Sequence, residues 1–386
     1  MKQITLLLFL FLLSSCAMDG DAPLTTFTPI DHNATEETRT LFTSLDAIRH
    51  QHVLFGHQDD LAYGYSWINE PGRSDVLETA GAFPAVYGWE LGDLELGHEE
   101  NLDGVNFENM KEWIKEGYRR GGVITIGWHM NNPATGGDAW DTEGDAVPTI
   151  LPGGENHEMF KGWLDTFADF VNDLTVTAKN GESHHVPILF RPFHEHNGSW
   201  FWWGQDLTTT EDFISLWRFT VEYLQDEKGL NNLLYSYSPD VFDSKEAYLE
   251  RYPGNEYVDI LGYDDYHSIR STDTQETFIN RLEMLVEMAE ERNKIPAMTE
   301  TGYEAIPDPN WWTETLLAGI NANETTRRIA YVLVWRNANH ENDRPDHYYA
   351  PFPGHPSEEN FREFREHDLI LFEDDLPDLY SLDMER

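Results

Sequence analysis

Two glutamates stand where an apolar stretch gives way to polar residues, a position in which a carboxyl group is costly unless it is hydrogen-bonded or reactive. Glu195 follows the apolar run 186–190, and Glu300 follows the apolar run 295–298. Aromatic residues close to Glu195 would remove water from its carboxyl group and favour the neutral form that a general acid needs. One acid and one nucleophile or base, both carboxylic, form the pair that glycoside hydrolysis requires.

Aromatic residues follow Glu195 within nine positions, in the order Trp200, Phe201, Trp202 and Trp203. The flat faces of such side chains stack on the apolar faces of sugar rings through buried area. A place in the hydrophobic core is the alternative for this run. Polar and glycine neighbours on both sides favour stacking, so the sequence predicts a sugar-binding cleft beside Glu195.

The 16 histidines raise the alternative of a metal site. His194 and His196 would share one face of an extended strand, which makes them a possible ligand pair. The pair His184 and His185 precedes a predicted strand and would lie at the opposite end of the fold. The chain has no cysteine near these residues and no HExxH spacing. We therefore expect neither a catalytic metal nor another cofactor.

Short apolar runs alternate with helical patterns, which predicts repeated βα units around a parallel sheet. Eight such units predict a single (β/α)8 TIM barrel domain over residues 33–386, with its active site where the strands end. An open doubly wound sheet is the alternative, but no glycine-rich phosphate loop follows an early strand. The longest connection, residues 131–155, either shapes one end of a cleft or is a plain surface insertion. The predicted strands are 53–55, 85–87, 123–126, 186–190, 233–235, 258–261, 295–298 and 331–334.

One predicted helix illustrates the periodicity of the segments between these strands. Within residues 274–292, Phe278, Leu282, Leu285 and Ala289 recur at helical spacing, while glutamates occupy the other face. The same pattern predicts helices over 107–120, 157–179 and 210–228.

Composition excludes several classes of protein. The chain has 26 Lys and Arg against 70 Asp and Glu, a net charge of −44, so nucleic acid and anionic membrane surfaces are poor partners. Apolar residues make up 40% and aromatic residues 13% of the sequence, which is too much for a disordered chain.

The amino terminus is typical of a secretory signal. Lys2 precedes the apolar run 4–13, which is shorter than the roughly 20 residues that span a bilayer. The sequence Leu-Ser-Ser-Cys ending at Cys16 resembles the bacterial lipobox, so residues 1–15 are predicted to be a lipoprotein signal peptide and Cys16 the lipidated residue. An ordinary signal peptide with a chance cysteine is the alternative. Residues 16–32 are predicted to form a flexible tether. We expect a monomer anchored by this lipid alone to the outer membrane of a Gram-negative bacterium, on its periplasmic or cell-surface face.

These motifs together resemble glycoside hydrolase family 26, which consists mostly of β-mannanases. The resemblance rests on Arg-Pro-Phe-His-Glu at 191–195 with Trp200 five positions on, Gly-Tyr-Asp-Asp-Tyr at 262–266, Glu-Thr-Gly at 300–302, and Trp335-Arg336. Histidine before the acid/base residue points to this family, because most related barrels have asparagine there. The resemblance implies a retaining mechanism with the carboxylates on the fourth and seventh strands, which agrees with the strand count above.

The resemblance also implies roles for individual residues. Glu195 would be the acid/base, Glu300 the nucleophile, and Tyr266 the residue that orients Glu300. Arg191 and His194 would line the subsite where the bond breaks. The other sugar-binding positions implied are Trp335 as that subsite's platform, Arg336 reaching the next sugar, Trp200 on the leaving-group side, and His129, Trp128 and Trp140 on the non-reducing side.

The function implied is hydrolysis of internal β-1,4-mannosidic bonds in mannan, galactomannan or glucomannan. The family also contains β-1,3-xylanases and lichenases, and exo-acting release of mannobiose is a further alternative. A different class is a non-catalytic sugar-binding lipoprotein. Presence of both Glu195 and Glu300 together with Tyr266 favours an enzyme, because binding alone does not need this trio.

Overall fold

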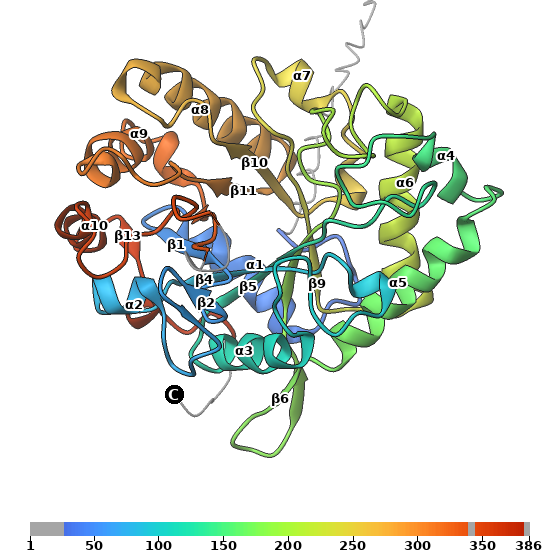
Figure 1. The fold of residues 1–386 in the computed structure, drawn as a ribbon, viewed down its shortest axis with the longest axis horizontal. Coiled ribbons are helices and arrows are strands. Elements are labelled where there is room, and N and C mark those ends of the chain that lie inside the picture. Colours follow the sequence, from blue (N-terminus) through green and yellow to red (C-terminus); the bar gives the residue numbers. More distant parts are fainter. Residues whose placement is uncertain (1–26, 339–343, 382–386) are drawn as a thin grey trace, which may run out of the picture.

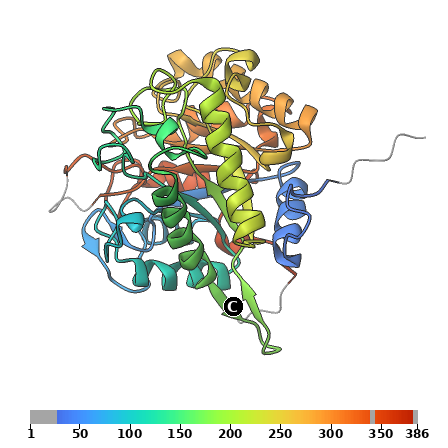
Figure 2. The ribbon, with the colours of Figure 1, turned by 90° about the vertical axis from the view of Figure 1, so that its right-hand side faces the viewer.

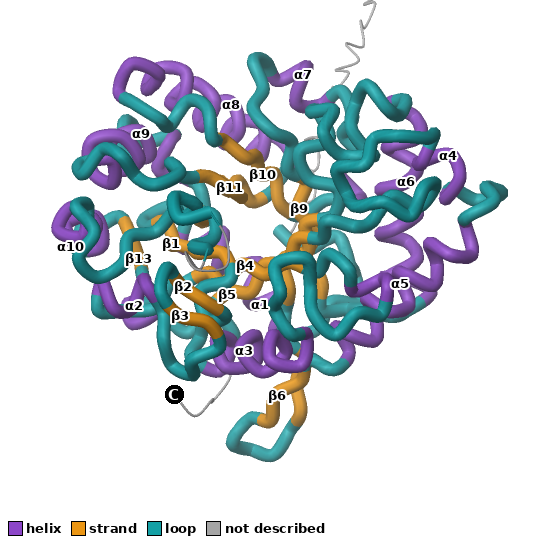
Figure 3. Tube along the Cα trace, in the orientation of Figure 1, coloured by secondary structure: helices purple, strands orange, loops and turns teal. Residues whose placement is uncertain are grey.

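Eight parallel strands close into a barrel in the computed structural model, which describes residues 27–338 and 344–381 (Figures 1 and 3). The closing pair is the first and last barrel strand, in which Leu54 lies opposite Tyr331. This closure confirms the predicted barrel and excludes the open sheet. In spatial order the barrel strands are β1 (Val53–Gln58), β4 (Val86–Glu90), β5 (Val123–Gly127), β8 (Ile188–Arg191), β9 (Leu233–Tyr237), β10 (Ile260–Asp265), β11 (Ile295–Thr301) and β12 (Tyr331–Val334).

Helices pack around the barrel, most of them on its outer side and the first one behind it, at the end away from the viewer of Figure 1 (Figures 1 and 2). They are α1 (Glu36–Ile48), α2 (Asp75–Ala80), α3 (Phe107–Arg119), α4 (Ala146–Ile150), α5 (His157–Asn172), α6 (Thr210–Glu222), α7 (Lys245–Leu249), α8 (Gln275–Arg292), α9 (Ala318–Ile320) and α10 (Glu358–Arg365). Short strands outside the barrel are β2 (Tyr63–Gly64), β3 (Trp67–Ile68) and β13 (Ile370–Leu371), which pairs with β1. The predicted loop 131–155 contains α4 and is otherwise irregular.

The helix predicted over 157–179 is wrong in its last turns. It ends at Asn172, and the chain continues into a hairpin of β6 (Thr175–Thr177) and β7 (Ser183–His185) that projects from the body of the protein (Figures 1 and 2). The run Thr-Val-Thr explains the change, because β-branched side chains favour strand over helix.

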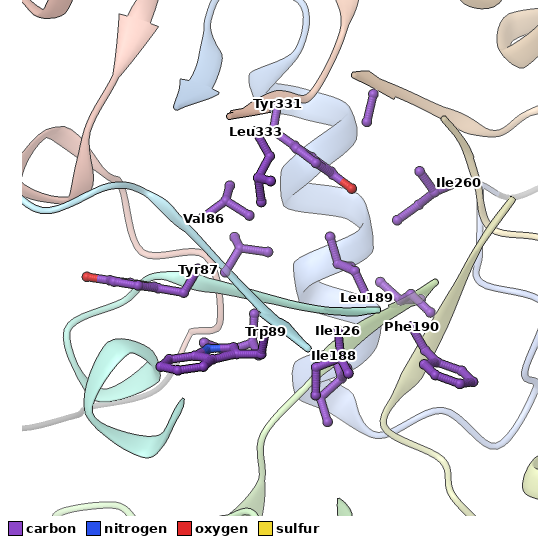
Figure 4. Packing of buried hydrophobic residues seen from close by; sticks show 14 of the residues in the cluster. Val86, Tyr87, Trp89, Ile126, Ile188, Leu189, Phe190, Ile260, Tyr331 and Leu333 are labelled. Atoms are coloured by element: carbon purple, nitrogen blue, oxygen red, sulfur yellow. The ribbon is translucent and has the colours of Figure 1, made fainter. Parts of the chain in front are cut away.

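The strands bury side chains on both of their faces, and for this reason their sequences are continuous apolar runs without alternating polar residues. Val86 and Leu333 lie inside the barrel, whereas Tyr87 and Trp89 point away from it towards α3 (Figure 4). Trp89 stacks on Trp113 of α3, with ring centroids 6.1 Å apart. The core therefore has an inner part inside the barrel and an outer part between strands and helices.

The segment before α1 is ordered over residues 27–32, so the predicted boundary between tether and barrel domain at residue 32 is too late. Phe27 stacks on Phe42 with centroids 4.6 Å apart, the Ile30 N–H donates to Asp259 Oδ1 at 2.7 Å, and Asp31 is buried. Residues 27–32 thus pack on the barrel and are not tether. The predicted signal peptide and Cys16 lie outside the described residues. Within 27–338 and 344–381, no helix combines the length and apolar character that a bilayer span requires.

Close packing of β10 against β11 positions a residue that the active site uses. A Cβ added to Gly262 of β10 would lie 2.4 Å from Thr299 Cγ2. Thr299 of β11 donates a hydrogen bond to Asp264 Oδ1 at 2.7 Å. Glycine at 262 therefore allows Thr299 to reach Asp264.

We expect Gly262→Ala to destabilise the fold by about 1–3 kcal/mol, lowering the melting temperature by several degrees, because its methyl group must displace Thr299. Gly162→Ala is the matched control, since Gly162 lies in the exposed face of α5 with no atom within 4 Å of an added Cβ. That change should stabilise the protein by up to about 1 kcal/mol. Calorimetry of both variants checks the expectation, and equal melting temperatures would contradict it.

Candidate active site

A cleft of about 390 Å³ opens where the barrel strands end. It brings together eight of the residues singled out from the sequence, which lie at or beyond the ends of five different strands. Those eight are His129, Trp140, His194, Glu195, Trp200, Tyr266, Glu300 and Trp335. Phe201 of the predicted stacking run lines it too, as do five residues to which the sequence interpretation gave no role: Arg270, Gly302, Tyr303, Glu304 and Tyr349.

Glu195 sits on a tight turn four residues beyond the end of β8. Phe193 and Glu195 both have left-handed backbone conformations, with φ of 49° and 52°. Side chains other than glycine rarely adopt this region, and such residues cluster at functional sites. The Glu195 N–H donates to the Ser238 carbonyl at 2.8 Å, and its half-buried carboxyl group accepts a 2.7 Å hydrogen bond from Trp200 Nε1. The turn thus aims the carboxyl group into the cleft.

Glu300 has a different setting, inside strand β11 itself and buried. Arg191 Nη2 donates to one of its oxygens, and the Tyr266 hydroxyl donates to the other at 2.9 Å. Arg191 does not line the cleft but is buried, where it also pairs with Asp264 Oδ2 at 2.9 Å. Glu300 is therefore held from two sides as a carboxylate, the form that can act as a nucleophile.

Three carboxyl groups converge at this point: Glu195, Asp264 and Glu300 each place an oxygen within 4.8 Å of the others. Burial, followed by the negative charges of Glu300 and Asp240, raises the pKa of Glu195 to about 8. Burial also raises the pKa of Asp264 well above its usual value, although Arg191 opposes this. Glu195 therefore carries a proton at neutral pH beside an ion-paired Glu300.

The separation of Glu195 and Glu300 has a chemical consequence. Carboxyl groups roughly 5 Å apart suit direct attack by one of them on the sugar, whereas an inverting pair stands roughly 6.5–9.5 Å apart to admit a water. An oxygen of Glu195 and an oxygen of Glu300 lie within 4.8 Å of each other, which agrees with the shorter separation expected for direct attack. The site can thus protonate a leaving group and supply a nucleophile at the same bond.

One wall of the cleft is built from stacked rings. His129 stacks on Trp140 with centroids 5.0 Å apart and planes 13° apart. His129 and His194 approach each other through their Nε2 atoms at 3.1 Å. Trp140 and Trp200 remain 48% and 39% exposed, so part of each side chain is accessible to a ligand.

The structure corrects the prediction for Trp128. Its side chain is fully buried, stacks on Phe167 at 5.5 Å and donates from Nε1 to Glu95 Oε2 at 2.9 Å. It cannot contact a sugar, because alternate residues of a strand point to opposite faces and Trp128 points outward to α5. Arg336 is not among the residues that line this cleft, and it pairs with Asp103 Oδ1 at 3.0 Å.

The aromatic run after Glu195 divides between cleft and core. Trp200 and Phe201 line the cleft, but Trp202 and Trp203 are buried, and Trp203 Nε1 donates to the His194 carbonyl at 2.8 Å. The stacking interpretation is therefore wrong for the last two. His196 does not converge with His194, because its ring packs between Phe213 and Tyr237.

Comparison with known proteins identifies the family. The sequence profile of glycosyl hydrolase family 26 matches residues 30–332. The chain belongs to glycosyl hydrolase family 26. A solved family 26 β-mannanase from Bacteroides ovatus is 44% identical, with a TM-score of 0.84, and the match covers 91% of this chain and 99% of that one.

Two other relatives are less similar to this chain. A mannan endo-1,4-β-mannosidase of Bifidobacterium adolescentis is 34% identical over 354 residues, which is 86% of this chain. The match covers 34% of that relative, so this chain spans about a third of its length. The mannan endo-1,4-β-mannosidase of Bacillus subtilis strain 168 is 30% identical over 281 residues, covering 69% of this chain and 73% of the relative.

The sequence interpretation missed Asp264 and Glu90, which contact Arg191 and His129 respectively. Both are acidic residues at or near the end of a barrel strand, the signal that singled out Glu300. Glu90 could not be given a role from the sequence, because its partner His129 follows the next strand and no sequence spacing joins them.

We expect two substitutions to move the pKa of Glu195 in opposite directions. Glu300→Gln removes a nearby negative charge and should lower it, whereas Trp200→Phe removes a hydrogen bond to the charged form and should raise it. Carbon-13 NMR titration of the Glu195 carboxyl group measures both. Glu304→Gln is the control, because Glu304 lines the same cleft but pairs with Arg344 and His347. A shift of equal size in the control would contradict the assignment.

Proposed function

We propose that this protein is a retaining glycoside hydrolase that cuts internal β-1,4-mannosidic bonds in mannan, galactomannan or glucomannan. The observation that carries the proposal is the pair Glu195 and Glu300. Their oxygens lie within 4.8 Å, one carboxyl group has a raised pKa and the other is ion-paired with Arg191.

In the first step, the protonated Glu195 donates its proton to the glycosidic oxygen while a Glu300 oxygen attacks the anomeric carbon. The bond between that carbon and the glycosidic oxygen breaks, the shortened glycan leaves as an alcohol, and an ester to Glu300 forms. In the second step, the Glu195 carboxylate takes a proton from water as its oxygen attacks the same carbon. The ester bond breaks, Glu300 is released as a carboxylate, and the configuration at the anomeric carbon is retained.

Coupling of the two carboxyl groups suits this change of role. The charge of Glu300 helps to keep the pKa of Glu195 raised, so Glu195 starts as an acid. Esterification of Glu300 removes that charge, and the pKa of Glu195 should then fall. A lower pKa favours the carboxylate that activates water, so one interaction supports both steps.

The other cleft residues fit sugar binding. Tyr266 orients Glu300 through its 2.9 Å hydrogen bond, and Arg191 does so from inside the barrel. Ring faces for stacking come from three tryptophans of the cleft, Trp335 and the exposed Trp140 and Trp200. His194 supplies a polar edge. The names of the relatives from B. ovatus, B. adolescentis and B. subtilis support mannan as the glycan.

The test is product analysis over time on linear mannan, galactomannan, β-1,3-xylan and mixed-linkage glucan. We expect mixed oligosaccharides from mannans, β-configured at first by proton NMR, and a loss of at least about 10³-fold in Glu300→Ala because the nucleophile is gone. Glu304→Ala, another cleft carboxylate, is the control.

Each other outcome would replace a part of the proposal. A single disaccharide from the earliest time point would indicate exo-action. Activity confined to xylan or glucan would indicate another substrate. Initial products of inverted configuration would refute the assigned role of Glu300. Binding without turnover would leave a sugar-binding lipoprotein.

We also propose that Cys16 carries the lipid that anchors the protein to the outer membrane of a Gram-negative bacterium. The proposal is supported by the apolar run 4–13 and the lipobox-like sequence that ends at Cys16. In such a host, metabolic labelling with a fatty acid should mark the wild type, whereas Cys16→Ser should lose the label and leave the membrane fraction. Equal labelling of both would contradict the anchor.

A further inference from the structure

The carboxylate of Glu90, the last residue of β4, accepts three hydrogen bonds although Glu90 does not line the cleft. Its Oε1 accepts the backbone N–H groups of His129 at 2.7 Å and Gly92 at 2.6 Å, and its Oε2 lies 2.8 Å from His129 Nδ1. Burial acts to raise the pKa of Glu90, but the charge of His129 and these hydrogen bonds outweigh it, so the pKa is lowered. An ionised carboxylate only accepts hydrogen bonds, so His129 Nδ1 must carry a hydrogen.

The contact between His129 and His194 then has defined hydrogen positions. Their Nε2 atoms lie 3.1 Å apart, which requires one hydrogen between them. In the neutral pair, His129 Nε2 is the acceptor, so His194 must donate from Nε2 and leave its Nδ1 bare. If His129 takes a second proton it becomes the donor, and a neutral His194 must carry its hydrogen on Nδ1. Adding one proton to the pair therefore moves the hydrogen of His194 from one ring nitrogen to the other.

Charges around the two rings decide where that proton resides. Burial alone would lower the pKa of His129, but the carboxylates of Glu90, Glu300 and Glu195 outweigh it and raise the pKa. Burial lowers the pKa of His194 well below its usual value, and Arg191, His129 and His196 lower it further. The positive charge thus belongs on His129, close to both catalytic carboxylates, while His194 stays neutral.

We propose that Glu90, His129 and His194 form a relay in which Glu90 fixes the hydrogen positions on both rings, so that Glu90 is a positioning residue for the hydrolysis at Glu195. The catalytic part of this inference rests on the proposed function. Through the relay, Glu90 sets which nitrogen of the cleft residue His194 donates and which accepts. His194 directly precedes Glu195, and its Nδ1 is buried with no hydrogen-bond partner among the described residues.

The wild-type protein gives the first measurement. Nitrogen-15 NMR distinguishes the protonated from the bare nitrogen of a neutral imidazole, and single substitutions of His129 and His194 assign the signals. Well above the pKa of His129, we expect hydrogen on Nδ1 of His129 and on Nε2 of His194. On acidification, the hydrogen of His194 should move to Nδ1 as His129 becomes charged. The opposite arrangement at high pH would overturn the relay.

Glu90→Gln should reverse the arrangement without changing its shape. The amide oxygen stays with the two backbone N–H groups, so the amide nitrogen faces His129 Nδ1 and donates to it. His129 must then carry its hydrogen on Nε2, and His194 on Nδ1. We expect kcat on mannan to fall at least about tenfold with a smaller change in KM, because an incorrect tautomer impairs the step and not the binding.

Glu95→Gln is the matched control. Glu95 is also buried near the same strand ends, and it accepts the Asn131 N–H at 2.6 Å and Trp128 Nε1–H at 2.9 Å, but it does not touch either histidine. It should keep the wild-type tautomers and the wild-type pH dependence of their exchange. Unchanged tautomers in Glu90→Gln, or an equal loss of kcat in both variants, would overturn the inference.

Failure of the relay is distinguishable from failure of the proposed function. The NMR measurement needs no substrate, so it refutes or supports the hydrogen positions whatever the enzyme hydrolyses. A wild type that cleaves no glycan in the panel would refute the proposed function and, with it, the catalytic role of Glu90.

Discussion

One buried guanidinium group holds the active site together. Arg191 leaves the end of β8 and pairs with Asp264 of β10 and Glu300 of β11. Without its charge, Asp264 and Glu300, which place oxygens within 4.8 Å of each other and of Glu195, would lose the ion pairs that stabilise their charged forms in a region with little water. An unpaired buried charge costs several kcal/mol, so removing any partner from this network affects the others. The barrel meets this constraint by bringing the three strands to one end of the same closed sheet.

The two catalytic carboxyl groups differ because their supports differ. Glu300 lies within a strand and is fixed by Arg191 and Tyr266, whereas Glu195 lies on a strained turn with a single indole N–H as its side-chain donor. The same residue type therefore carries a proton in one position and an ion-paired charge in the other. This asymmetry is what an acid and a nucleophile need, and it arises from where each strand ends.

Most of the fold was predictable from apolar periodicity, and the errors have physical causes. The strands at 53–55, 258–261 and 295–298 each extend three or four residues further than predicted, through polar residues such as Asp264 and Glu300. The residues at these strand ends are buried but polar, because they belong to the active site. A search for apolar periodicity therefore does not recognise them as part of the strand. Trp202 and Trp203 were wrongly predicted to face the cleft, because their polar sequence neighbours do not show which rings are buried.

The sequence by itself determined the parts of this protein that depend on residue type and local spacing: eight strands, the two glutamates, the tyrosine and the family. Only the tertiary structure decided which side chains meet. Three features depend on contacts between parts of the chain that are far apart in sequence. Arg191 holds Glu300 from inside the barrel, Trp128 belongs to the core, and Glu90 reaches His129. The pKa of a carboxyl group, and hence its role, depends on burial and on charges brought near it by the fold, and neither quantity is encoded in local sequence.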